Sequence, residues 1–193
     1  MKINAPRIVA FFLLIALSIG FGFGFDAVMT SIEHHKYPIR EELQLAVAEK
    51  SELYNVPEEI LWATLHATGG FSSNKVSKSG AIGLMQITPA RFEFICTEIL
   101  KVGVRDAGLL YDPMTNLDAG CAWLSYLYRY YGVWEHVHAA YYVGTETVDA
   151  WLSNPENLDA HGMLKKIPDD TVAAYVKDVT RAAKYYEKLY YAS

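Results

Sequence analysis

The stretch ATGGFSSNKVSKSGAIGLMQITP, residues 67–89, decides how this chain folds. Two consecutive glycines end a predicted helix, a turn rich in Ser, Asn and Lys follows, and the segment GLMQ, residues 83–86, leads into a second predicted helix. A polar turn jointed by glycines is typical of a cleft that binds or transforms a ligand. Between Glu59 and Glu93, however, the sequence contains no Asp or Glu. The predicted cleft therefore lacks the acidic side chain that many catalytic clefts contain.

Helical periodicity surrounds this stretch on both sides. Asn55 and Glu58 match a capping box, and the proline between them would lie in the first turn. They predict a helix through Ala67, with Thr68 in the last turn facing whatever the helix packs against. Further helices, with an Asn-, Pro- and Gly-rich loop before the last, are predicted over residues 39–54, 88–102, 115–131, 134–142 and 170–191. No longer segment alternates as a strand does, so the sequence predicts an all-α or nearly all-α domain.

The N-terminal residues form a separate segment. Lys2 and Arg7 precede an 18-residue run without charge, residues 8–25, and a helix of that length nearly crosses the hydrocarbon layer of about 30 Å. An uncleaved membrane anchor is favoured over a cleaved signal peptide, because the run offers only a poor small-x-small cleavage site. The positive charges before the run predict that the rest of the chain lies outside the cytoplasm, either tethered to the membrane or secreted. We divide the chain into an anchor or signal segment (1–25), a stalk (26–36) and one folded domain (37–193).

Composition argues against several classes of protein. With 52% hydrophobic and 20% charged residues, the chain resembles a folded protein. A formal net charge of −5 and the lack of a basic run in the sequence argue against nucleic acid as a partner.

Cys96 and Cys121 fit either one disulfide or two buried free thiols. His136 and His138 point to different faces of a predicted helix, so we interpret them as exposed or half-buried side chains. We expect no metal and no cofactor.

Five motifs, in order and with the expected gaps, resemble the SLT domain of soluble lytic transglycosylases. Those enzymes are relatives of goose-type lysozyme that cut the glycan strands of bacterial peptidoglycan. The resemblance runs from about Leu45 to Tyr186 and is carried by YNVPEEILWATLHATGGF (54–71), SKSGAIGLMQITP (77–89), YDPMTNLDAGCAWLSYL (111–127), AAYYVG (139–144) and IPDDTVAAYVKDV (167–179). It implies a lysozyme-like fold, either all-α or a predominantly helical α+β arrangement.

The resemblance also implies a mechanism, for which one residue is missing. Family members keep a glutamate at the end of the second helix, in Glu-Ser-x-Phe. That acid protonates the glycosidic oxygen and then takes the proton from the muramic 6-hydroxyl, which yields a 1,6-anhydro product. In this chain TGGF (68–71) stands at that motif and puts Thr68 in the acid's place. A threonine hydroxyl does not ionise near neutral pH, and loss of a positioned general acid typically costs ~10²–10⁴-fold in rate.

Other departures from the family pattern lie beside the same cleft. Tyr142 replaces the family's Asn, and the segment Thr171–Ala173 replaces its Glu-Thr-Arg. The substrate-binding positions are otherwise kept. By the resemblance they are Ser77, Gly83, Met85, Gln86, Tyr141 and Tyr175, with Tyr142 as the altered neighbour. The sequence thus predicts a cleft that still binds sugar but has lost its catalytic centre.

Three functions are consistent with this pattern. The first is a membrane-tethered domain that binds peptidoglycan glycan strands, or positions cell-wall proteins, with lost or impaired catalysis. The second is an active lytic transglycosylase with a displaced acid, for which Glu146 and Glu93 are candidates, although acidic side chains are usually solvated at the surface. The third is a protein-interaction module that keeps only the fold. The sequence leaves open whether the chain is an enzyme.

Overall fold

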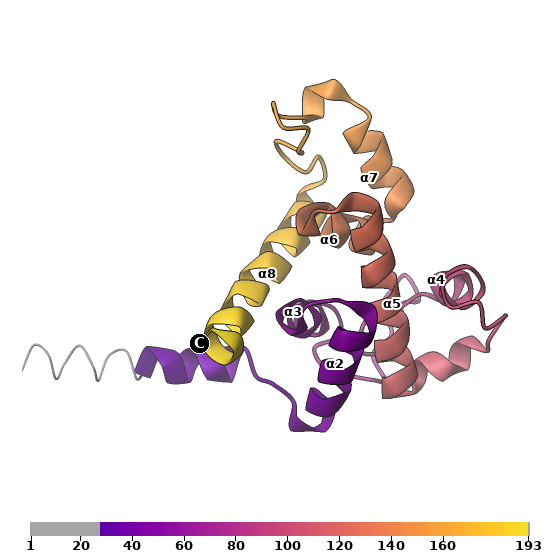
Figure 1. The fold of residues 1–193 in the computed structure, drawn as a ribbon, viewed down its shortest axis with the longest axis vertical. Coiled ribbons are helices and arrows are strands. Elements are labelled where there is room, and N and C mark those ends of the chain that lie inside the picture. The colour runs from indigo at the N-terminus through magenta and orange to yellow at the C-terminus, as the bar shows by residue number, and fades with distance from the viewer. Residues whose placement is uncertain (1–27, 193) are drawn as a thin grey trace, which may run out of the picture. The chain divides into compact units, whose positions relative to one another are not determined.

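The computed structural model describes residues 28–192 of the chain (Figure 1). It divides the chain into two units, residues 1–38 and 39–193. In the described part of the first unit, residues 28–36 are helical. The predicted anchor or signal segment, residues 1–25, lies outside the described residues. Among the residues that are described, no helix is both long and apolar enough to span a bilayer.

The second unit is built from helices, which confirms the all-α prediction. Its α-helices are α2 (Glu41–Tyr54), α3 (Glu58–Thr68), α4 (Pro89–Phe94), α5 (Pro113–Tyr131), α6 (Trp134–Val143), α7 (Thr145–Leu152) and α8 (Asp170–Tyr186). Short helical turns extend or join them: two π-helical turns, Ile95–Ile99 and Glu187–Tyr191, and two 3₁₀ turns, Ala107–Tyr111 and Pro155–Asn157. Residues 28–192 contain isolated antiparallel bridges but no strand.

Five of these helices pack in a closed ring (Figure 1). α3 contacts α2 and α8, α6 contacts α5 and α8, and α2 and α5 contact each other. α3 is buried continuously from Ile60 to Leu65, as expected of a helix with neighbours on several sides. α8 buries an apolar stripe that includes Val172, Val176, Val179, Ala183 and Tyr186. This packing fixes the last turn of α3, which carries Thr68.

Two helices begin differently from the prediction. α3 follows Pro57 with no side-chain cap, so the predicted capping box was wrong. Asn55 instead ends α2 in the left-handed conformation, with φ of 51°, a role for which asparagine is well suited. α5 begins two residues earlier than predicted because the Asp112 carboxylate caps it, accepting a hydrogen bond from the Thr115 N–H at 2.8 Å.

Two further segments also differ from the prediction. The sequence predicts a loop after α6, but Thr145–Leu152 forms α7 and buries Val148. The helix predicted over residues 88–102 consists of α4 and the π-helical turn, and it ends at Ile99. The chain then leaves the helical conformation, with φ of 56° at Lys101 and 77° at Gly103.

The two cysteines and two of the histidines are enclosed in the domain. Cys96 and Cys121 are buried free thiols and not a disulfide, which is one of the two alternatives that the sequence left open. His136 and His138 are both buried, so the expectation of exposed or half-buried histidines was wrong. α6 is in contact with α5, α7 and α8. Histidines on two different faces of that helix are therefore both covered.

Candidate functional site

A cleft of about 480 Å³ opens where the end of α3, the α3–α4 loop (residues 69–88), α4, α6 and α8 meet. We call it the α3 cleft. Its walls combine small, hydroxylated and aromatic side chains: Ala67, Thr68, Ser77, Ser79, Ala81, Gln86, Thr88, Arg91, Tyr141, Tyr142 and Tyr175. The volume falls within the range of about 300–1,000 Å³ that is typical of ligand sites.

Thr68 joins the end of α3 to the α3–α4 loop. Its hydroxyl oxygen lies 2.7 Å from the Thr64 carbonyl oxygen and 3.1 Å from the Leu84 carbonyl oxygen. Because a hydroxyl has one proton to donate, the two carbonyls share it. The Lys75 ammonium donates to the Thr68 carbonyl at 2.6 Å and so covers the end of the helix. The side chain at residue 68 is thus a link between two main-chain segments and carries no ionisable group.

The neighbour of Thr68 must be a glycine in this structure. A Cβ atom at Gly69 would lie 2.0 Å from the Leu84 carbonyl oxygen and 2.9 Å from the Leu84 Cα. Gly69 itself has ordinary helical dihedrals, so the requirement comes from close approach of the loop and not from backbone conformation. At this position the family motif quoted above has a serine. The α3–α4 loop therefore packs directly on the helix where a family member would place a side chain.

The Asn116 side chain of α5 holds the α3–α4 loop in place. This side chain is fully buried. Its Oδ1 accepts from the Met85 N–H at 2.8 Å, and its Nδ2 donates to the carbonyls of Ile82 and Leu110, each at 2.8 Å. Gly83 lies so close that a Cβ there would be 2.2 Å from Nδ2, and its φ of 81° also favours glycine. One buried amide thus satisfies three main-chain groups.

Two polar side chains of the loop are oriented by neighbouring main chain. The Ser77 hydroxyl accepts from the Ala81 N–H at 3.0 Å. The Gln86 side-chain Nε2 donates to the carbonyls of Lys75 and Gly83 at 3.0 and 2.9 Å. Both side chains line the α3 cleft, and their orientation is set before any ligand binds. Such preorganisation lowers the entropic cost of binding.

Tyrosines from α6 and α8 form an aromatic wall. The Tyr141 hydroxyl donates to the Met85 carbonyl at 2.7 Å. The Tyr142 and Tyr175 rings lie 4.8 Å apart, and the Tyr175 hydroxyl is buried without a hydrogen-bond partner among the described residues. Burial raises the pKa of both Tyr141 and Tyr175 above the usual range, so both stay protonated at neutral pH. Tyr175 thus lines the cleft, and its buried O–H lacks an acceptor among the described residues.

Arg91 is the charged residue that sequence reasoning missed. Its Nη1 donates to the Tyr141 carbonyl at 2.9 Å, and its guanidinium lies 5.1 Å from the centre of the Trp123 ring. Burial lowers the pKa of Arg91, yet arginine remains a cation at neutral pH. Among the residues that line the α3 cleft, Arg91 alone carries a charge. Nothing local in the sequence points to this role, because its partner lies 50 residues away.

The structure brings most of the predicted site residues together. Thr68, Ser77, Gln86, Tyr141, Tyr142 and Tyr175 all line the α3 cleft. Gly83 and Met85 are buried beside it, and the Met85 carbonyl holds Tyr141. Glu93 and Glu146, the candidates for a displaced acid, are exposed and are not among the lining residues. Besides Arg91, sequence reasoning missed Ala67, Ser79, Ala81 and Thr88.

The lining of the α3 cleft offers groups that can bind a ligand. No Asp or Glu is among its lining residues, and residues 28–192 contain no cluster of three His, Cys, Asp or Glu side chains that could hold a metal ion. What the cleft offers is aromatic rings, hydroxyls, an amide and one guanidinium. These groups match a polyol or amino sugar, whose C–H faces pack on rings while its hydroxyls form hydrogen bonds.

A ring of helices with a glycine-rich loop at the end of α3 is the architecture of a lysozyme-like transglycosylase domain. The chain matches the Transglycosylase SLT domain over residues 46–163 and belongs to this family.

Its relatives include enzymes of the same family. The soluble lytic murein transglycosylase of Escherichia coli K12 is 31% identical over 133 residues, which are 68% of this chain and 21% of that protein. The membrane-bound lytic murein transglycosylase C of Yersinia enterocolitica is 36% identical over 88 residues, which are 44% of this chain and 24% of that protein. The crystal structure of the 70 kDa soluble lytic transglycosylase of Escherichia coli aligns with a TM-score of 0.73 and 26% identity, covering 81% of this chain and 25% of that one. The chain thus spans about a quarter or less of the length of these relatives.

Proposed function

We propose that the folded domain, residues 37–193, binds peptidoglycan glycan strands in the α3 cleft and that its catalysis is lost or impaired. Membership of the SLT family supports the fold and the class of substrate, since relatives are named as murein transglycosylases. The polar and aromatic lining of the cleft supports binding of an amino-sugar polymer. These relatives are much longer than this chain, so we propose their substrate, peptidoglycan, for this domain and test it below.

The observation that carries the proposal is the position of Thr68. Its hydroxyl is engaged with the Thr64 and Leu84 carbonyls, and no carboxylate lines the cleft beside it. Glycosidic cleavage needs a proton donor within hydrogen-bond reach of the leaving oxygen. A threonine hydroxyl does not ionise near neutral pH, so it cannot supply that proton or take it back. The binding function survives such a change because it depends on the loop and the aromatic wall.

Three groups would contact the sugar. The Tyr142 ring, which is about half exposed, offers a face for packing. The Tyr175 hydroxyl is buried at the cleft wall and offers an unused donor once a small side-chain movement exposes it, and the Arg91 guanidinium attracts a carboxylate of the peptidoglycan. The carboxylate would not need to displace an existing ion pair, because Arg91 has none among the described residues.

The location of the protein is part of the same proposal. We assign residues 1–25 to an anchor or signal segment and residues 26–36 to a stalk, which would hold the domain outside the cytoplasm where its ligand occurs. One relative is named as a membrane-bound lytic transglycosylase. Cell-wall proteins are further partners in this arrangement.

Binding is tested by sedimentation of the full chain with purified peptidoglycan. Tyr175→Phe removes only the unpartnered hydroxyl and should weaken retention several-fold while leaving the thermal midpoint unchanged or higher. Tyr111→Phe, at an exposed tyrosine outside the cleft, is the matched control and should bind as the unmodified chain does. If the unmodified chain does not sediment with peptidoglycan, the binding proposal is wrong and the protein-interaction alternative remains.

Catalysis is tested in the same samples by chromatography of 1,6-anhydro-muropeptides. The unmodified chain should release little or none, whereas Thr68→Glu should release more than Thr68→Gln, which has the same size but no acid. Release by the unmodified chain at the rate of an active relative would refute the loss of catalysis. In that event Glu93→Gln and Glu146→Gln would identify a displaced acid.

A further inference from the structure

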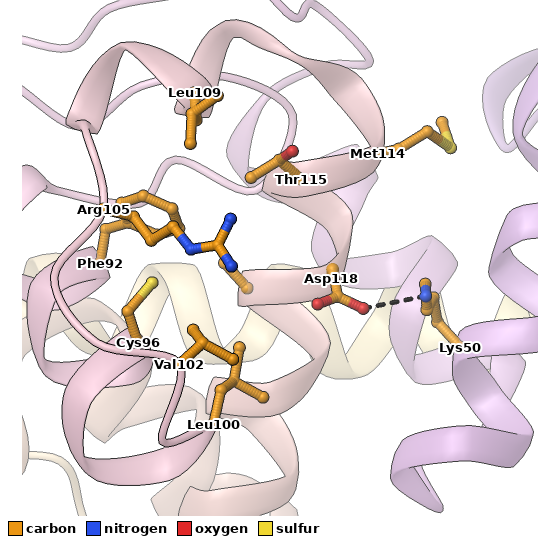
Figure 2. Close-up of a pocket in the computed structure, with 11 residues that line it drawn as sticks. Lys50, Phe92, Cys96, Leu100, Val102, Arg105, Leu109, Met114, Thr115 and Asp118 are labelled. Atoms are coloured by element: carbon orange, nitrogen blue, oxygen red, sulfur yellow. Dashed lines mark ion pairs between the residues drawn. The ribbon is translucent and has the colours of Figure 1, made fainter.

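A second cavity lies on the other side of α4 and shares no lining residue with the α3 cleft. It measures about 450 Å³ and is bounded by α2, α4, the segment 100–106 and α5. We call it the α4–α5 pocket and show it in Figure 2. Consecutive residues of α4 divide the two sites, since Arg91 lines the α3 cleft and Phe92 lines the α4–α5 pocket.

The irregular end of α4 creates the pocket. After the π-helical turn Ile95–Ile99, the chain turns back and the Val102 N–H donates to the Cys96 carbonyl at 2.9 Å. Positive φ values at Lys101 and Gly103 make this reversal possible. The reversal carries Arg105 to the pocket, and in Figure 2 its guanidinium reaches inward, between the wall formed by Phe92 and Cys96 and the carboxylate of Asp118.

Apolar side chains at this pocket are exposed to water. Val102, Leu109 and Met114 line it with 49%, 39% and 42% of their surface accessible. Single exposed apolar residues are common, but three that line one concave surface are typical of a site that is covered by a ligand or partner. A ligand that filled the pocket would remove this apolar surface from water.

The charges at the pocket leave one cation uncompensated. Lys50 pairs with Asp118 at 2.9 Å and with Glu49 at 3.2 Å, and the first of these pairs is drawn in Figure 2. Arg105 forms no ion pair or hydrogen bond within residues 28–192. The side chains that line the pocket therefore carry a net charge of one positive unit, so the ligand they complement has a single negative charge.

We propose that the α4–α5 pocket binds an amphipathic monocarboxylate. Its carboxylate pairs with the Arg105 guanidinium, whose planar donors match a carboxylate in two-point contact. Its apolar body lies against Val102, Leu109 and Met114. This chemistry is shared by a short free acyl carboxylate and by the carboxyl-terminal residue of a peptide that ends in an apolar side chain, and the test distinguishes the two sources.

The test is isothermal titration calorimetry on the full chain in lipid nanodiscs, with empty nanodiscs as the blank. The probes are hexanoate for the acyl source and N-acetyl-leucine for the peptide source, and each is paired with its amide, hexanamide or N-acetyl-leucinamide. At least one acid should bind saturably and about tenfold or more tightly than its amide, the factor expected for loss of one charge-assisted pair. The acid that binds identifies the source.

Substitutions test whether the acid binds in the α4–α5 pocket. Arg105→Gln should reduce the affinity of the acid to that of the amide, and Leu109→Ser should weaken both. Lys101→Gln is the control, because this exposed lysine of the same segment pairs with Glu98 and does not line the pocket; it should bind as the unmodified chain does. The proposal is overturned if neither acid binds, if acid and amide bind equally, or if Arg105→Gln keeps full affinity. None of these results depends on peptidoglycan binding, which is measured at the other site.

Discussion

Asn116→Ala should be among the most destabilising single substitutions in this domain. The side chain makes three hydrogen bonds of 2.8 Å to main-chain groups and is fully buried. Alanine would leave the Met85 N–H and the Leu110 carbonyl without their partner in a buried site, and the Ile82 carbonyl would keep only the hydrogen bond from the Ile87 N–H at 3.1 Å. An unsatisfied buried group costs about 1–3 kcal/mol, and allowing for partial relaxation we expect a total loss of about 3–5 kcal/mol. That is a large share of the 5–15 kcal/mol that typically stabilises a domain.

Urea denaturation followed by circular dichroism measures this loss as a lower midpoint at unchanged slope. Asn74→Ala is the control, because that asparagine is exposed in the α3–α4 loop and makes no hydrogen bond within the described residues; it should change stability by less than about 0.5 kcal/mol. Asn116→Asp tests the direction of the bonds. It keeps the acceptor for the Met85 N–H but turns a carboxylate oxygen toward the Ile82 and Leu110 carbonyls, so it should be at least as damaging at neutral pH. A loss below about 1 kcal/mol for Asn116→Ala would refute the reasoning.

Three further predictions concern residues around the same core. Gly120→Ala should cost about 1–3 kcal/mol in a denaturation experiment, because the new Cβ would lie 2.3 Å from the Met85 sulfur; an unchanged midpoint would contradict this. Tyr141→Phe removes the 2.7 Å hydrogen bond to the Met85 carbonyl and should cost about 1–2 kcal/mol by the same measurement. Burial lowers the pKa of His138 from 6.5 to about 3, so between these values the unfolded chain binds a proton that the native domain does not. Stability should therefore fall as the pH drops from 6.5 toward 3, by at most ~1.4 kcal/mol per pH unit, and the slope should be shallower in His138→Gln; equal slopes would show that His138 does not titrate this way.

The α3 cleft is the part of the structure that the sequence predicts best. Helical spacing placed Thr68 in the last turn of α3, and the two glycines after it marked the end of that helix. These two features depend on neighbours in sequence, where propensity and periodicity are informative. The cleft residues Ser77, Gln86, Tyr141 and Tyr175 were implied by the resemblance to the SLT family and not by periodicity.

Features that depend on distant contacts escaped prediction. Arg91 owes its place to the carbonyl of Tyr141 and the ring of Trp123. The burial of His136 and His138 follows from the number of helices around α6 and not from the spacing of the two residues. No pattern within a single helix records how many neighbours that helix will have.

The contact between Gly69 and the Leu84 carbonyl determines which residues this chain can accept after Thr68. A Cβ atom at residue 69 overlaps the main chain of the loop unless Leu84 withdraws, and Thr68 helps to hold Leu84 where it is. A glutamate introduced at residue 68 would still leave no space at residue 69 for the serine that follows the acid in the family motif. A Glu-Ser pair therefore requires a shift of the main chain at Leu84 as well as the two substitutions.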